Sequence, residues 1–173
     1  MKSRKTSIFR KNLSWVALAI LVTTIVFVIA SINVSDRLLI DSSSQVLLKT
    51  ANLAAVTMES ERKSPEFQVS AFAQEVTSTT GYRVTIIDSG GKVLAESEAD
   101  PESMANHLSR PEVKAALQTE SGVAVRKSAT TGERTLYAAT LLPQDATSPA
   151  IVLRLAMPLP FGAASLVQSQ VLI

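Results

Sequence analysis

The chain has 173 residues, of which 46% are hydrophobic and 18% charged, and its formal net charge is +2 at pH 7. Twelve of the 17 Lys and Arg residues lie beyond Lys11, together with all 15 Asp and Glu residues, so that this larger part carries about −3. The basic excess is confined to the first residues and does not indicate nucleic-acid binding. Because the chain has no cysteine, a disulfide framework and a thiolate metal site are excluded.

A long apolar segment follows the basic N-terminus. Residues 13–35 contain no ionisable side chain, and about twenty apolar residues in a helix cross a ~30 Å hydrocarbon core. We expect a transmembrane helix at 13–35 in the cell (inner or plasma) membrane, with residues 1–12 as a cytoplasmic basic tail and the chain from Asp36 outside. The alternative is a cleaved secretory signal, but the run is long for one, and Ala30 and Ser31 offer only a poor cleavage site.

Helical character continues beyond the apolar segment. Residues 36–63 contain neither Gly nor Pro, and Pro65 then breaks the pattern. Leu39, Val46 and Leu53 recur every seven residues, which predicts a stripe for packing against a neighbouring helix. Polar residues between them make the coiled-coil signal weak, and we interpret the stripe as a dimer helix. A second helix is expected over 66–79, with Gly81 as its C-cap.

The texture then changes to an alternation of period two. Two helical segments are expected within the strand region. The first is a short helical turn at Asp100-Pro101. The second is a helix that a capping box opens, Ser109 to Glu112, and that Gly122 ends. Tight turns favour an antiparallel arrangement, so the class is α+β, with one domain over 36–160. The strands are expected near 82–87, 92–97, 123–128, 135–142 and 151–157. The predicted core includes Val84, Ile86, Val93, Leu136, Leu153 and Leu155.

The last residues are uncharged and become apolar only at the end. We expect 161–173 to be the start of a juxtamembrane or second transmembrane helix, truncated here. The alternative is a short helix that packs on the domain.

One long run of motifs is specific enough to suggest a family. Residues 83–117, RVTIIDSGGKVLAESEADPESMANHLSRPEVKAAL, resemble the extracytoplasmic sensor domain of PhoR-like and WalK-like histidine kinases, which regulate phosphate uptake or the cell wall. The resemblance continues through GERTLY at 132–137 and LRLAMP at 153–158. It implies a PAS-like (Cache-type) fold, with a five-stranded antiparallel sheet flanked by helices. It also implies a kinase core and a response regulator as partner, neither of which lies in these residues.

The residues offer no catalytic set, and no cofactor or metal is expected. His107 is the only histidine; it is followed by Leu108, where a kinase phosphoacceptor box has an acidic residue, and it is predicted to lie outside, away from ATP. A ligand pocket, if present, should lie between the sheet and the 100–117 connection. Its polar candidates are His107, Arg110, Arg126 and Tyr137, since Arg suits bidentate capture of a carboxylate or phosphate. The competing interpretation is structural: Arg126 faces water and Arg110 caps a helix.

These features favour a membrane-anchored sensory part of a two-component sensor histidine kinase. We expect a homodimer that receives its signal from an unknown small ligand or an extracytoplasmic partner protein. The alternative is the same module on a chemoreceptor or a diguanylate cyclase. A pilin-like structural protein is disfavoured, because Phe9 to Leu13 lack the glutamate that follows a pilin leader.

Overall fold

The computed structural model describes residues 3–129, 131–144 and 148–159. Helix α1 runs from Ser3 to Glu61, and its stretch from Asn12 onward is the one helix in the described residues that is long and apolar enough to cross a membrane. The expected span at 13–35 and its helical continuation are therefore a single helix. A compact unit covers Ile40–Pro160, and α1 before Ile40 lies outside it. The prediction for 161–173 falls outside the described residues.

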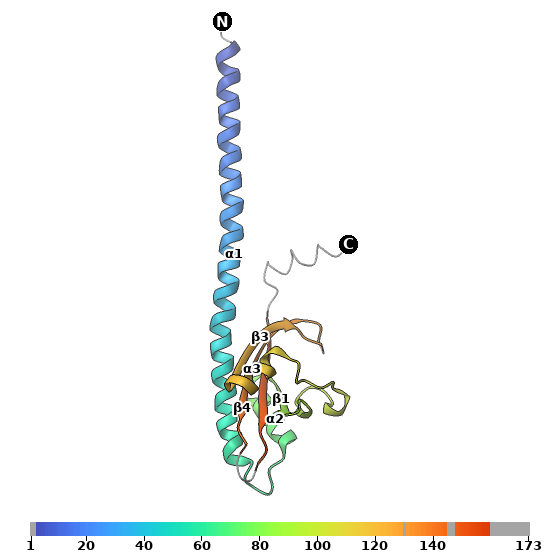
Figure 1. Cartoon of the computed structure of the whole chain (residues 1–173). Helices are drawn as coiled ribbons and strands as arrows, with labels where there is room; N and C mark the ends of the chain where they lie inside the picture. Colours follow the sequence, from blue (N-terminus) through green and yellow to red (C-terminus); the bar gives the residue numbers. More distant parts are fainter. Residues whose placement is uncertain (1–2, 130, 145–147, 160–173) are drawn as a thin grey trace. The chain divides into compact units, whose positions relative to one another are not determined.

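The compact unit contains the predicted five-stranded antiparallel sheet (Figure 1). Its strands run in the order β2-β1-β5-β4-β3, so β5 is central and hydrogen-bonded to β1 and β4. Each strand lies within two residues of its expected bounds, since alternation of β-branched and apolar residues defines them. The strands are β1 (Arg83–Asp88), β2 (Val93–Glu96), β3 (Ser121–Lys127), β4 (Arg134–Leu142) and β5 (Ile151–Pro158).

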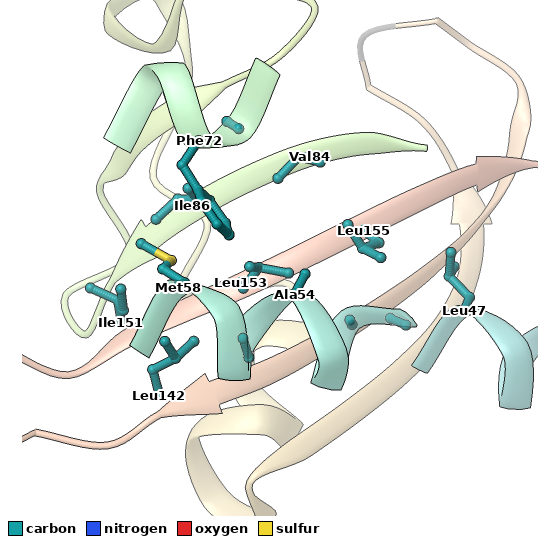
Figure 2. Close-up of a cluster of buried hydrophobic side chains, with 14 of the residues drawn as sticks. Leu47, Ala54, Met58, Phe72, Val84, Ile86, Leu142, Ile151, Leu153 and Leu155 are labelled. Carbon is teal, nitrogen blue, oxygen red and sulfur yellow. The ribbon is translucent and has the colours of Figure 1, made fainter. Parts of the chain in front are cut away.

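One face of the sheet packs against α1 and α2 to form the main core (Figure 2). Helix α2, Val69–Thr80, ends as expected at Gly81, whose φ of 73° is a left-handed conformation that suits glycine. Met58 of α1 and Phe72 of α2 meet the sheet side chains Ile86 and Leu153 in this core. The six core residues predicted from the alternation are all buried, with no more than 3% of their surface exposed.

Helix α1 divides its side chains between this core and the outside. Leu47, Ala51 and Met58 are buried against the sheet. Val46 and Leu53 of the heptad stripe are 55% and 67% exposed, and Leu39, before the compact unit, is 46% exposed. The domain's own core therefore does not use the stripe.

The opposite face of the sheet has a smaller apolar cluster. It joins Val113 and Ala116 of α3 (Pro111–Thr119) to Ile87, Ala139 and Val152 of the sheet. The connection from β2 to α3 also lies over this face and includes the short helix η1 (Pro101–Ser103). Asp100 caps η1 as expected, because its carboxylate accepts a hydrogen bond from the Glu102 N–H at 3.0 Å.

Helix α3 begins within the predicted segment, at Pro111, but both predicted caps are wrong. The helix is capped by the backbone of Arg110 with no side-chain hydrogen bond, and Glu112 is fully buried rather than turned back onto a Ser109 cap. The helix ends at Thr119, and Glu120 takes the left-handed conformation, with φ 67°, that we expected of a glycine. Gly122 instead lies in β3, where a Cβ would overlap the Glu112 carbonyl oxygen, so its role is close packing beneath α3.

Candidate functional site

Strand register gathers polar residues on the sheet face that α3 and the connection cover. Thr85 of β1 is paired with Glu96 of β2 on one side and with Arg154 of β5 on the other. Direct partners in an antiparallel pair project to the same face, so these three side chains form a row across the sheet. Arg83 and Tyr137, both paired with Ala156, lie in the adjacent row on the same face.

Arg154 is the centre of a buried hydrogen-bonded network. Its guanidinium is 1% exposed and donates to the Thr85 hydroxyl at 2.8 Å and to Glu112 of α3 at 3.3 Å. The Thr85 hydroxyl donates in turn to Glu96 at 2.6 Å. Arg83 lies 3.3 Å from the other oxygen of Glu96. Charges this deeply buried are tolerated only when paired, and here Arg154 is paired with Glu112 and Arg83 with Glu96.

Arg126 of β3 enters the same network from its edge. It donates to both carboxylate oxygens of Glu112, at 2.7 and 3.3 Å, and its guanidinium carbon lies 3.9 Å from the centre of the Tyr137 ring. The guanidinium carbon of Arg154 lies 5.0 Å from the same ring centre. Both guanidiniums are thus within reach of a cation–π interaction with Tyr137, and both are held by the same carboxylate, that of Glu112.

His107 is positioned by an interlock between two turns. The backbone N–H of His107 donates to the Gly91 carbonyl at 2.8 Å, and the side-chain amide of Asn106 donates to the Gly90 carbonyl at 2.7 Å. A Cβ on Gly91, whose φ is 87°, would overlap Asn106 Oδ1, so the close approach requires glycine. The ring Nδ1 lies 2.6 Å from the Ala105 carbonyl. Since a carbonyl only accepts, Nδ1 carries the proton, and Nε2 of the neutral ring is an acceptor.

These side chains surround a cavity of about 230 Å³ between the sheet and the β2–α3 connection. Its lining consists of four arginines, His107, Tyr137 and five small or flexible residues. The arginines are Arg83, Arg110, Arg126 and Arg154, and the small or flexible residues are Ala99, Ser103, Met104, Ala105 and Ala129. Among the described residues, no Asp or Glu lines the cavity, which makes it strongly cationic.

Burial and charge shift three pKa values at this site. Burial, and then the charge of Arg154, lower the pKa of His107, and the hydrogen bond to Ala105 offsets this only in part. Burial would raise the pKa of Glu112, but hydrogen bonds from Arg126 and its own backbone, with the arginine charges, hold it below its usual value. Burial lowers the pKa of Arg154 to about 10. At neutral pH Arg154 and Glu112 are thus charged and His107 is neutral.

All four residues predicted for the pocket line this cavity. Arg126 does not face water, because it turns back to Glu112, and Arg110 caps α3 only with its backbone. That they bind a ligand stays a prediction. The sequence analysis missed Arg83, Glu112 and Arg154. The signal for Arg154 was available: it is the one charged residue in the otherwise apolar strand IVLRLAM.

A second hollow, of about 640 Å³, lies beside α1 between Asn52 and Glu59, next to the end of β4. Glu59 and Glu120 are its charged lining residues, and none of the residues predicted for the pocket lines it. In the described ranges no group of three His, Asp or Glu could hold a metal ion.

No family model and no curated protein matches the sequence. Solved structures do match. The sensor domain of Escherichia coli DcuS is similar over 75% of this chain and 98% of that one, with 16% identity and a TM-score of 0.51. An extracellular ligand-binding receptor from Desulfohalobium retbaense is similar over 78% of this chain and 27% of its own, with 14% identity and a TM-score of 0.52.

A third similar structure is the Bacillus subtilis YkuI protein, which has an EAL domain and was solved with c-di-GMP and calcium. It matches over 75% of this chain and 35% of its own, with 16% identity and a TM-score of 0.52. At such identities these likenesses show the fold alone. The fold is PAS-like, of the Cache type, as the resemblance implied.

Proposed function

We propose that this chain is the membrane-anchored sensory part of a two-component sensor histidine kinase. In this proposal residues 13–35 cross the cell membrane, Ile40–Pro160 lies outside the cytoplasm, and a kinase core passes the signal to a response regulator. The chain acts as a homodimer. The basic residues before the span support the orientation, and the run of motifs at 83–117 supports the kinase output.

The observation that carries the sensory role is the arginine-lined cavity. Four guanidiniums converge on it, and no acidic side chain lines it among the described residues. Ligand sites are concave and present a few convergent polar groups that orient the ligand. The fold is also that of the DcuS sensor domain and of an extracellular ligand-binding receptor. The signal in this proposal is a small anion, bound in the cavity.

The same sensor could act on a chemoreceptor or a diguanylate cyclase. The fold is shared with proteins of different output, of which YkuI with its EAL domain is one, so the cavity does not decide between them. The motifs at 83–117 favour the kinase.

Thermal unfolding of the full chain in detergent micelles tests the anion site. Sulfate and succinate serve as probes, because a ligand at 100 times its dissociation constant stabilises the folded state by about 2.7 kcal/mol. We expect a rise in melting temperature with at least one probe, and a smaller rise in Arg110→Gln. Lys114→Gln removes the same charge from an exposed position of α3 and should behave as the parent. Equal shifts in both variants would show that the anion binds elsewhere.

A further inference from the structure

The charges that surround the cavity do not cancel. Four arginines line it, and two carboxylates contact them: Glu96 lies 3.3 Å from Arg83, and Glu112 is shared by Arg126 and Arg154. In the described part of the chain, Arg110 has no ion pair. Since His107 is neutral and no acidic side chain lines the cavity, the cluster retains two positive charges.

Three of these arginines also hold donors that make no hydrogen bond. The Nε atoms of Arg83, Arg110 and Arg154 are buried and have no hydrogen-bond partner, although Arg83 Nε lies 3.3 Å from Glu96 in an ion pair. An unmet donor on a charged group that is withdrawn from water costs free energy, and the penalty is largest at Arg154, which is 1% exposed. An anion in the cavity would balance the charge, and its oxygens are of the type that such N–H groups require.

The cavity volume limits the size of that anion. At about 230 Å³ the cavity is smaller than the ~300–1,000 Å³ typical of sites for drug-sized ligands. This space suits an oxyanion or a short organic acid. Ala99, Met104, Ala105 and Ala129 give part of the lining an apolar character, which would tolerate a short carbon chain.

We infer that the cavity binds a compact dianion, whose two negative charges match the two uncompensated arginine charges. This inference rests on the proposed function, and it adds the valence and size of the ligand. Two sources share the chemistry: an inorganic oxyanion such as sulfate or phosphate, and a short dicarboxylate.

Isothermal titration of the full chain in micelles, at low ionic strength and pH 7.5, distinguishes these sources by two matched pairs. Sulfate is compared with methanesulfonate, and succinate with succinamate, so that each pair keeps the shape and removes one charge. We expect the dianion to bind at least tenfold more tightly than its monoanionic partner in one pair. The pair that shows this preference identifies the inorganic or the organic source.

Two variants connect the preference to the charge count. Arg110→Gln removes one uncompensated charge and should reduce the preference several-fold, whereas Arg110→Lys keeps the charge and should retain most of it. Circular dichroism verifies that both are folded. Equal affinity within each pair would overturn the dianion inference and leave the anion sensor standing. No binding of any of the four probes would overturn both.

Discussion

Glu112 is the residue on which the buried positive charges of the site depend. It is fully buried and accepts hydrogen bonds from both Arg126 and Arg154. Removing one partner of a buried ion pair typically costs about 3–5 kcal/mol, because the other charge stays buried and unpaired. We therefore expect Glu112→Gln to lower the melting temperature of the full chain strongly, as measured by circular dichroism.

The control for this variant is Glu102→Gln. The Glu102 side chain is 79% exposed and lies 3.9 Å from Lys92, so its loss should change stability little. Adding Arg154→Met to Glu112→Gln should recover part of the loss, because the unpaired buried charge is then gone. A double variant less stable than Glu112→Gln alone would show that the cost lies in packing.

His107 should make the stability of the ligand-free domain depend on pH. Its pKa in the folded chain lies below its ordinary 6.5, chiefly because of burial and then Arg154. As the pH falls below 6.5, the unfolded chain gains a proton that the folded chain does not accept. The stability that neutral His107 contributes is therefore fully present above pH 6.5, and it is lost as the pH falls toward the lower pKa of the folded chain.

Unfolding at pH 7.5 and pH 5.5 measures this effect. The parent should lose more stability between these values than His107→Gln, which cannot gain the proton. A bound dianion offsets the arginine charges, so saturating sulfate should reduce the parent's loss. Identical pH dependence in the parent and the variant would show that His107 does not resist protonation.

At this scale the sequence predicted only part of the polar lining: it missed Arg83 and Arg154, and it did not predict the hydrogen bonds that join these side chains. His107, Arg110, Arg126 and Tyr137 could be placed together, because their elements were expected on one side of the sheet. Glu112 was assigned to a capping box, since its spacing from Ser109 fits that motif equally well. Only the tertiary contact with Arg126 and Arg154 decides between the two roles, and no local pattern reports a pairing 42 residues away.

At the scale of elements, α3 lies so close to β3 that only glycine fits at position 122. A Cβ there would overlap the Glu112 carbonyl oxygen and lie 2.8 Å from the Ala115 Cβ. Inserting a methyl group into such a contact costs about 1–3 kcal/mol. We expect Gly122→Ala to lower the melting temperature and to weaken anion binding, because α3 carries Glu112.

Gly90→Ala is the matched control for this substitution. Its Cβ would meet the Asp88 side chain at 3.3 Å, in an exposed turn where that side chain can yield. It should melt close to the parent. If Gly122→Ala also melts like the parent, then the contact between α3 and β3 is looser than described.

The elements themselves were largely predictable. Strands β1, β4 and β5 are nearly continuous runs of β-branched and apolar residues, which predicted their bounds to within one residue, and both faces of each strand are largely buried. The end of α3 was not predictable, because Glu120 adopts a conformation that glycine usually supplies, and its neighbour Gly122 was the stronger local signal.

At the scale of the whole molecule, the exposed stripe on α1 predicts a homodimer. Val46 and Leu53 are large apolar side chains that the domain's own core leaves exposed. Because the chain has no cysteine, single cysteines can be placed freely. We expect cysteines at Leu39, Val46 and Leu53 to crosslink between subunits in membranes, and an exposed control at Lys49 to react less. Equal and weak crosslinking at all four positions would contradict the dimer helix.

The membrane orientation is a second prediction at this scale. Five basic residues precede the apolar segment, and the positive-inside rule then places the compact unit outside the cytoplasm. A reporter enzyme that is active only outside the cytoplasm, fused after Leu159, should be active. A cytoplasmic reporter at the same position should be silent. The reverse pattern with good expression would show the opposite orientation.

The central place of β5 has a mechanical consequence. Arg154, which reaches the cavity, and Pro158, where the strand ends, are four residues apart, or about 13 Å of extended chain. A force along a strand axis loads the hydrogen bonds of that strand in shear. Because β5 is bonded on both sides, two ladders resist such a force together, where an edge strand would have one. A displacement of Arg154 along the strand should therefore move Pro158 by nearly the same distance, because the strand between them stretches little.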